Sequence, residues 1–234
     1  RYALLPGSFS GGMRQRTVMA IALAVCVVAV LAAGASLAYF TDKTDAANNT
    51  FTMGNVKITL DETDLTNDDG SRTPAGNTYT NLYPGMDMVK DPIVHNTGKN
   101  DAWVRVIVRV ANGAAFMDKF AIAPYASSPL EGLTHGLGEG WQITASTKDT
   151  ATNDMVYTIV YNNVLKPGES TPAVFNKLYI PATFGNGEMA AITYTKANNE
   201  SVNGFTMSIH AEAIQSEGLN ATSCQKAFTD YWAD

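Results

Sequence analysis

The chain has 234 residues, of which 45% are hydrophobic and 16% are charged, and it contains two cysteines. This composition excludes a collagen-like, a disulfide-stapled and a fully disordered protein. All 22 acidic residues follow Ala38, where 13 basic residues accompany them, so this part carries a formal charge of −9. A surface of that sign disfavours binding to nucleic acid and to anionic lipid heads.

The first predicted element is a secretory signal peptide over residues 13–38. A short basic region precedes an apolar stretch from Val18 to Ala33, and small residues occupy positions 36 and 38. This order is typical of a leader that is cleaved, here between Ala38 and Tyr39. We interpret residues 1–12 as a non-native upstream extension.

A transmembrane anchor is the alternative interpretation of the same segment. The 23 residues from Val18 to Phe40 contain no charge and are enough to cross a bilayer. Gly34 and Ser36 interrupt the apolar run where a peptidase needs extended backbone, which favours cleavage. We therefore expect contact with a membrane only through an uncleaved signal peptide.

Residues 55–234 show the alternation of apolar and polar residues that is typical of β-strands. Strands are predicted at 55–60, 87–94, 103–110, 155–161, 173–180, 190–195 and 205–211. Pro84-Gly85 and Pro167-Gly168 predict type II turns before strands. Residues 61–80 are predicted as a mobile loop, and 114–125 and 221–232 as short helices. Together these elements predict an all-β fold, an antiparallel jelly-roll-like β-sandwich with one or two short helices.

Several short motifs carry a resemblance to a known family. These are the Ala38-Tyr-Phe-Thr-Asp42 segment, the strand pattern from Asn49 to Leu60, and the turn at 82–85 that leads to 94–98. In this order and spacing they resemble the TasA/camelysin family of secreted biofilm-matrix fibre proteins, which are processed by a SipW-type signal peptidase. The resemblance is clear over roughly residues 13–110 and thin until about residue 205.

The resemblance implies a bacterial structural subunit, secreted to the extracellular matrix or cell surface, that polymerises into fibres. By matching position, residues 39–54 form an extended N-terminal segment that is a candidate donor strand for a neighbouring subunit. The implied assembly residues lie in the donated segment or at its junction with the body, and they are Tyr39, Phe40, Asp42, Phe51, Val56, Ile58 and Leu60. The implied partners are further copies of the chain, a SipW-type peptidase and an accessory matrix or anchoring protein. Pairing of the same segment within its own sandwich is the alternative.

Camelysin is labelled a metallopeptidase, so an enzymatic alternative has to be tested on the residues. A zinc peptidase of the common helical type needs two histidines one helical turn apart with a carboxylate between them. His95, His135 and His210 are isolated, with no His-Glu-x-x-His motif, and two of them lie near predicted strands with no acidic partner pattern. We therefore expect no enzymatic activity, no catalytic or metal-binding residues and no cofactor.

Three further features have both a structural and a functional interpretation. Asp61, Glu62, Asp64, Asp68 and Asp69 could bind calcium, but their spacing does not fit an EF-hand and a solvated loop is favoured. The three tryptophans could form a carbohydrate-binding, adhesive surface, although core packing explains them equally well. Cys224 is the single thiol left after cleavage, and a buried, inert thiol is favoured over an intermolecular bridge.

Overall fold

The structure is a computed structural model that describes residues 41–45, 49–50, 56–67, 69–74, 79, 81–121, 128–195 and 201–232. All of these residues fall in one compact unit, Phe40–Asp234. The predicted signal peptide lies outside the described residues. Within them, no helix combines the length and the apolar character that crossing a bilayer requires.

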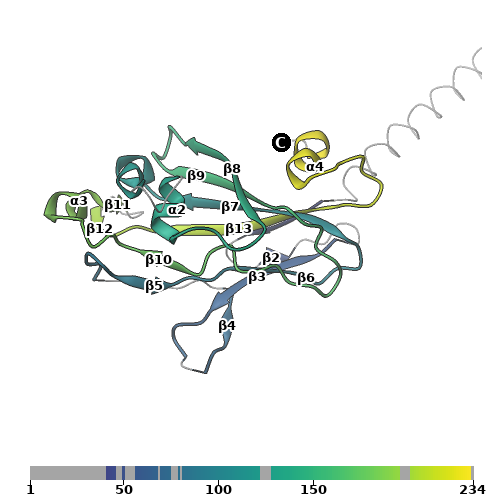
Figure 1. The fold of residues 1–234 in the computed structure, drawn as a ribbon, viewed down its shortest axis with the longest axis horizontal. Helices are drawn as coiled ribbons and strands as arrows, with labels where there is room; N and C mark the ends of the chain where they lie inside the picture. The colour runs from purple at the N-terminus through teal and green to yellow at the C-terminus, as the bar shows by residue number, and fades with distance from the viewer. Residues whose placement is uncertain are drawn as a thin grey trace, which may run out of the picture. The chain divides into compact units, whose positions relative to one another are not determined.

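One layer of the fold is a six-stranded antiparallel sheet with the strand order β2-β1-β13-β7-β9-β8 (Figure 1). Its strands are β1 (Thr41–Asp45), β2 (Asn49–Thr50), β7 (Ala102–Val110), β8 (Trp141–Lys148), β9 (Met155–Tyr161) and β13 (Met207–Gln215). The long strands β7 and β13 pair along nine residues and form the centre of this sheet.

The facing layer is assembled from shorter strands. It contains β3 (Ile58–Thr63), β4 (Arg72–Thr73), β5 (Asp87–Val89), β6 (Ile93–Asn96) and β10 (Lys177–Tyr179). Strand β6 pairs with β3 on one side, and the N–H groups of Asn96 and Thr171 bond the carbonyls of Glu169 and Val94 on the other. The pair β11 (Thr193–Thr195) and β12 (Ser201–Asn203) forms a separate two-stranded sheet.

The hydrophobic core lies between the two layers. Strand β7 contributes four fully buried valines at alternate positions, from Val104 to Val110, while β3 and β6 contribute the fully buried Ile58 and Val94. This alternation was predicted from the sequence, and the antiparallel all-β fold is confirmed. The predicted turns are confirmed as well, because Gly85 and Gly168 have φ of 85° and 78°, and i to i+3 backbone bonds close both turns.

The few helices are short: η1 (Gly113–Ala115) and η2 (Met117–Phe120) are 3₁₀-helices, and α2 (Pro129–Thr134), α3 (Asn186–Ala191) and α4 (Cys224–Tyr231) are α-helices. Helix α4 confirms the predicted C-terminal helix. The helix expected over 114–125 is replaced by two 3₁₀ turns, because Phe116 between them has a non-helical φ of −141°. Residues 122–125 of that prediction lie outside the described residues.

Two predicted strands have different bounds in the structure. The strand expected over 87–94 is two strands, because Lys90 turns its side chain inward to Glu62 and Pro92 has no N–H to donate. In the segment 190–195, the first two residues end α3. The carboxylate of Glu188 accepts a hydrogen bond of 2.9 Å from the N–H of Gly185, which fixes the first turn of that helix.

The loop predicted over 61–80 is also corrected. Strand β3 continues to Thr63, and β4 pairs with it through Glu62 and Thr73, so the acidic residues at 61 and 62 belong to a sheet. Conversely, the strand predicted over 173–180 is regular only over β10. Strand β8 was not predicted, because a bulge between Ile143 and Ala145 and an exposed polar second half disturb its alternation.

Candidate functional site

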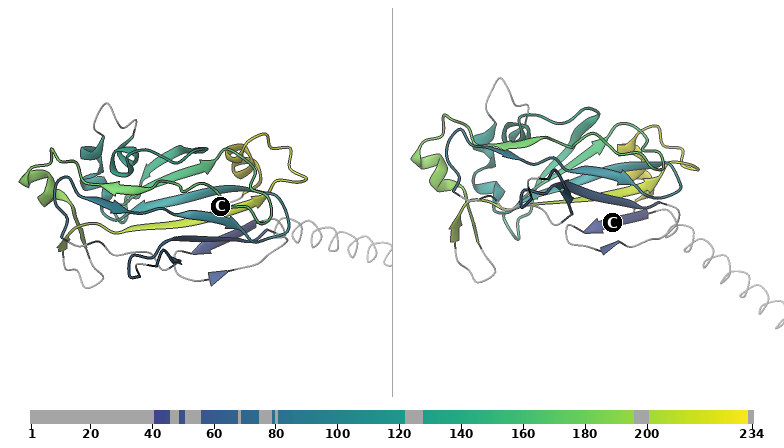
Figure 2. Two further views of the ribbon diagram at one scale, coloured as in Figure 1. Left: turned by 60° about the horizontal axis from the view of Figure 1, so that its bottom comes forward. Right: turned by 90° about the horizontal axis from the view of Figure 1, so that it is seen from below.

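The first candidate site is the junction between β1 and β13. Three residues of β1, from Thr41 to Lys43, lie opposite Ile214 to Glu212 of β13 in antiparallel register. Strand β1 lies near the margin of the sheet, with only the two-residue β2 outside it (Figure 2). Along the rest of β13, from Met207 to Ala211, no described strand pairs with this edge. The junction is therefore a short, terminal pairing on a long strand.

The strand that receives β1 is held firmly on both faces. Ala211 and Ala213 are fully buried in the main core, whereas Ile214 is 1% exposed and packs in a second cluster beneath α4. Between them, the carboxylate of Glu212 is buried and accepts a hydrogen bond of 2.6 Å from Nε of Arg105 on β7. The residues of β13 that pair with β1 are thus packed on both faces by other parts of the body.

Helix α4 covers the outer face of the sheet at this end. The hydroxyl of Ser223 caps the helix by accepting a bond from the N–H of Lys226. Phe228 packs into the second cluster, and the Arg105 guanidinium lies 4.3 Å from the centre of its ring. An apolar cover and a cation–π contact therefore hold the helix against β7 and β13.

Cys224 opens this helix and is buried, as predicted. Its Sγ donates a hydrogen bond of 3.0 Å to the carbonyl of Val104, and burial raises the pKa of the thiol to about 12. A thiol in this state is a poor nucleophile at neutral pH. The structure therefore supports an inert thiol and not an intermolecular bridge.

The residues expected to mediate assembly fall into three groups. Ala38, Tyr39, Phe40 and Phe51 lie outside the described residues. Asp42 is on β1, opposite Ala213. Val56, Ile58 and Leu60 belong to the body: the first two are fully buried, and Ile58 and Leu60 pair with β6 of the same chain. In this single copy they pair within their own chain, and their role in assembly stays a prediction.

The three histidines lie on separate elements and do not converge. His95 is on β6, His135 ends α2 and His210 is on β13. Within the described ranges, no group of three or more metal-ligating side chains is present. Two histidines have acidic neighbours that no sequence pattern indicates: Nε2 of His95 is 2.9 Å from Oδ2 of Asp61, and Nε2 of His210 is 3.5 Å from Oε1 of Glu212.

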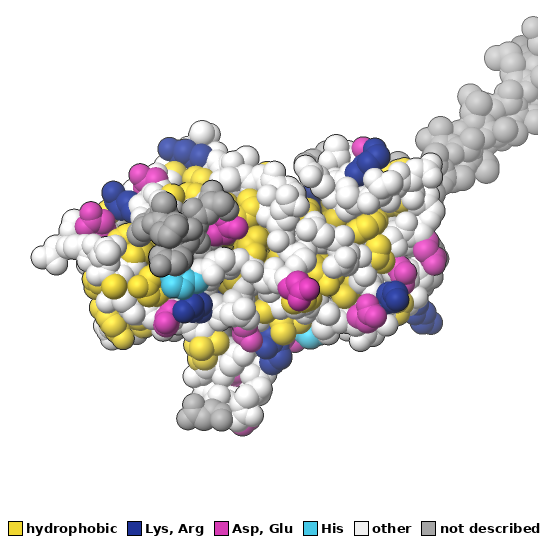
Figure 3. All heavy atoms as spheres, viewed as in Figure 1, with side chains coloured by type: hydrophobic (Ala, Val, Ile, Leu, Met, Phe, Trp, Pro, Cys, Tyr) yellow, Lys and Arg dark blue, Asp and Glu magenta, His cyan; other side chains and the backbone are white. Residues whose placement is uncertain are grey.

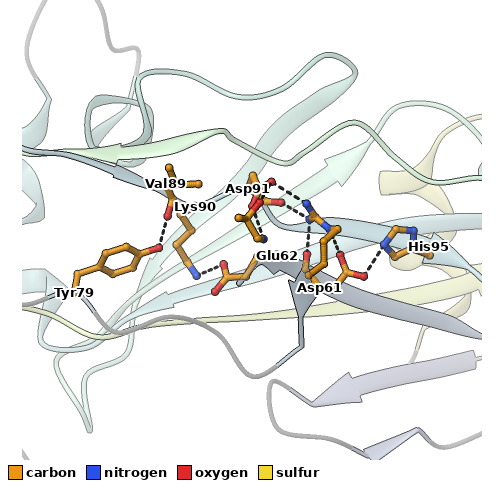
Figure 4. A network of polar contacts seen from close by, with 9 residues as sticks. Asp61, Glu62, Tyr79, Val89, Lys90, Asp91 and His95 are labelled. Carbon is orange, nitrogen blue, oxygen red and sulfur yellow. Dashed lines mark hydrogen bonds and ion pairs between the residues drawn. The ribbon is translucent and has the colours of Figure 1, made fainter. Parts of the chain in front are cut away.

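The acidic cluster of the sequence is dispersed in the structure, in a polar network along β3 (Figure 4). Successive strand residues point to opposite faces, so Glu62 bonds the buried Lys90 at 2.5 Å while Asp61 bonds Arg72 and lies beside His95. Asp64 instead accepts bonds from Thr66 in the tip of the hairpin. Asp68 lies outside the described residues. Strand geometry thus places the neighbours Asp61 and Glu62 on opposite faces, and no described group gathers these carboxylates around one cation.

Arg72 fixes β4 to this network. Its guanidinium donates to Asp61 and, at 2.8 Å, to Oδ2 of Asp91. Partial burial raises the pKa of Asp91, but bonds from the N–H of Thr63 and from Arg72 outweigh burial and hold that pKa below its usual value. The two-residue strand β4 therefore depends on ion pairs as well as on backbone pairing.

Two of the three tryptophans are buried. Trp103 and Trp141 are 8% and 6% exposed and belong to the two hydrophobic clusters. Trp232 is half-buried, with its ring 5.3 Å from that of Phe228. On the face shown in Figure 3, acidic and basic side chains are interspersed. Core packing is therefore the role of two of these three residues.

Comparison with known families gives a match over part of the chain. Residues 12–104 match the family described as camelysin metallo-endopeptidase, which is under half of the chain and extends from the predicted leader to the start of β7. No curated protein and no solved structure matches the chain. The similarity therefore covers β1 and β3 to β6, whereas β13, the strand that receives β1, lies beyond it.

Proposed function

We propose that this chain is a secreted structural subunit that assembles into extracellular fibres by exchanging β1 between copies after its leader is removed. The observation that carries the proposal is the three-residue pairing of β1 on the edge of β13. A second copy can offer the same strand to the same edge, so the exchanged contact repeats the internal one. The resemblance to the TasA/camelysin family and the match over residues 12–104 support the same role.

The predicted cleavage site lies where cleavage would regulate the exchange of β1. Cleavage after Ala38 leaves Tyr39 as the new N-terminus, two residues before β1 begins at Thr41. A strand at a free terminus can leave its own sheet and reach another without opening the body. Cleavage by a SipW-type peptidase would then permit assembly, which takes place outside the cell. A matrix or anchoring protein would hold the first subunit of the fibre.

A pair of cysteines distinguishes exchange from internal pairing. Asp42 and Ala213 lie opposite each other, at a spacing between paired strands that suits a disulfide. The experiment is to oxidise Asp42→Cys/Ala213→Cys protein, beginning at Tyr39, as monomer and as filament. We expect an internal disulfide in the monomer and a ladder of covalent multimers in the filament, on a non-reducing gel. Filaments with internal disulfides alone would contradict strand exchange, and the two single variants are the controls.

Removal of the segment tests the same proposal by microscopy. Protein that begins at Tyr39 should form filaments in negative stain, whereas protein that lacks residues 39–50 should remain a folded, soluble monomer. Equal polymerisation of both proteins would show that the N-terminal segment is not the donor.

A metallopeptidase is the second candidate, and the description of the matching family is the observation in its favour. It requires cleavage of casein by monomeric protein, sensitive to a chelator and restored by zinc. The absence of cleavage with added zinc would exclude it.

A further inference from the structure

A second cluster of reactive side chains lies in the other layer of the sandwich, away from the β1 junction. Ser170, His95 and Asp61 come from three separate segments of the chain, and His95 contacts each of the other two. Oγ of Ser170 lies 2.6 Å from Nδ1 of His95, and Nε2 of the same ring lies 2.9 Å from Oδ2 of Asp61. A serine, an imidazole and a carboxylate in this order form the arrangement that activates a serine hydroxyl.

Sheet register explains why these residues meet. His95 pairs with Thr59 on β3, so Asp61, two residues along the same face, is its diagonal neighbour. On the other side, the backbone bonds from Asn96 to Glu169 and from Thr171 to Val94 flank Ser170 and hold it opposite His95. The serine and imidazole therefore approach through backbone pairing and not through a flexible loop.

The carboxylate is positioned by Arg72. The guanidinium binds Oδ1 and the backbone carbonyl of Asp61, which leaves Oδ2 directed to the imidazole. The contact of Nε2 with Asp61 is close but is not aligned as a hydrogen bond in this structure. In enzymes without bound substrate such contacts are often poorly aligned and tighten when substrate binds.

The cluster borders a shallow hollow of about 530 Å³ that is wide open to solvent. Its lining includes all three residues together with Thr59, Thr97 and Glu169. Ser170 itself is exposed, so a ligand can reach its hydroxyl from solvent. Because two carboxylates, Asp61 and Glu169, line the hollow, it favours neutral or cationic ligands over anionic ones.

We propose that Ser170 is an activated nucleophile that accepts an acyl group from a neutral or cationic ester. Oγ of Ser170 forms a bond to the ester carbonyl carbon, and the proton of the hydroxyl passes to His95. The bond from that carbon to the leaving alkoxide breaks, and the alkoxide takes the proton from His95. Water then attacks the serine ester with His95 as base, which releases the acid and restores the serine.

A fluorophosphonate with an uncharged linker tests the nucleophile directly, because it forms a stable phosphonyl ester with an activated serine and releases fluoride. The purified protein is labelled, digested and analysed by mass spectrometry. We expect the peptide that contains Ser170 to be labelled at least about tenfold faster than the one that contains Ser201, which is also exposed but lies on β12. Equal rates at the two serines would overturn the proposal.

Variants distinguish activation of Ser170 by His95 from simple exposure of Ser170 to the reagent. His95→Gln keeps a polar side chain beside Ser170 and should slow labelling about 100-fold, whereas Ser201→Ala should leave the rate at Ser170 unchanged. Thermal melts establish that each variant is folded. Labelling that does not change in folded His95→Gln protein would show that the imidazole does not activate Ser170. Filament formation by the same variants should not change, so this test is independent of the assembly proposal.

Discussion

The two edges of β13 are paired very differently, although they belong to one strand. On one edge, β7 pairs with it along nine residues, and on the other, β1 pairs with three. The first contact brings together the buried faces that form the core, so the body cannot fold without it. The second adds a terminal strand to an edge that is already in place. The β1–β13 pairing can therefore be replaced while the β7–β13 pairing stays intact, and exchange between subunits requires this difference.

Breaking the β7–β13 pairing should have the largest effect on stability. Ile107 of β7 lies opposite His210 on β13 and Thr158 on β9, so proline at this position removes a backbone bond from one of two paired edges. We expect Ile107→Pro to lower the free energy of unfolding by about 3 kcal/mol, because β7 loses a backbone hydrogen bond and the partner carbonyl in the middle of the sheet is left unpaired. Circular dichroism during urea unfolding measures this loss. Near-normal stability would contradict the central position of β7.

Much of the sheet around β7 and β13 could be predicted from the sequence. The alternation in β7, β9 and β13 is recognisable because one face of each strand packs in the main core, although α4 also covers part of the other face. The two Pro-Gly turns have local chemistry that fixes their shape. Irregular segments were missed for physical reasons. Strand β8 contains a bulge, and the segment 87–94 is divided by an inward-facing lysine and a proline. Their geometry depends on neighbours that are distant in the sequence.

The same limit applies to the candidate sites. The contact of His95 with Asp61 and Ser170 joins residues up to 109 positions apart, so no local motif indicates it. The sequence did indicate the N-terminal segment, but through a family resemblance and not through strand periodicity. The strand that receives it, β13, was expected as an ordinary strand over 205–211, and its last four residues, where β1 pairs, were not included.

A smaller effect should follow from loosening β4, a two-residue strand that side-chain ion pairs hold in place. Asp91→Asn removes the carboxylate that receives bonds from Thr63 and Arg72. The pKa of Asp91 is lower in the folded chain than in the unfolded one. Its contribution to the free energy of unfolding is therefore present above about pH 4 and disappears as the pH falls through the folded-state value.

The measurement is urea unfolding of the wild-type and Asp91→Asn proteins at pH 7 and at pH 3. We expect the wild-type protein to be more stable by about 1.5 kcal/mol at pH 7, with a smaller difference at pH 3. A difference that does not depend on pH would show that the carboxylate charge is not what fixes the β3–β4 hairpin to Asp91.

Breaking the β1–β13 pairing should have the smallest effect on stability. It is also the sharpest test of the difference between the two edges of β13. N–H groups of successive strand residues point to opposite edges, so the double change Asp42→Pro/Lys43→Pro removes one donor toward β13. Because only three residue pairs join β1 to β13, we expect a loss of less than about 1 kcal/mol. Filament formation, which depends on the same three pairs in the exchanged form, should nevertheless stop. Electron microscopy and sedimentation measure the filaments, and unfolding in urea measures stability. A double variant that unfolds like Ile107→Pro would show that β1 is part of the permanent body, and one that still forms filaments would show that another surface joins the subunits.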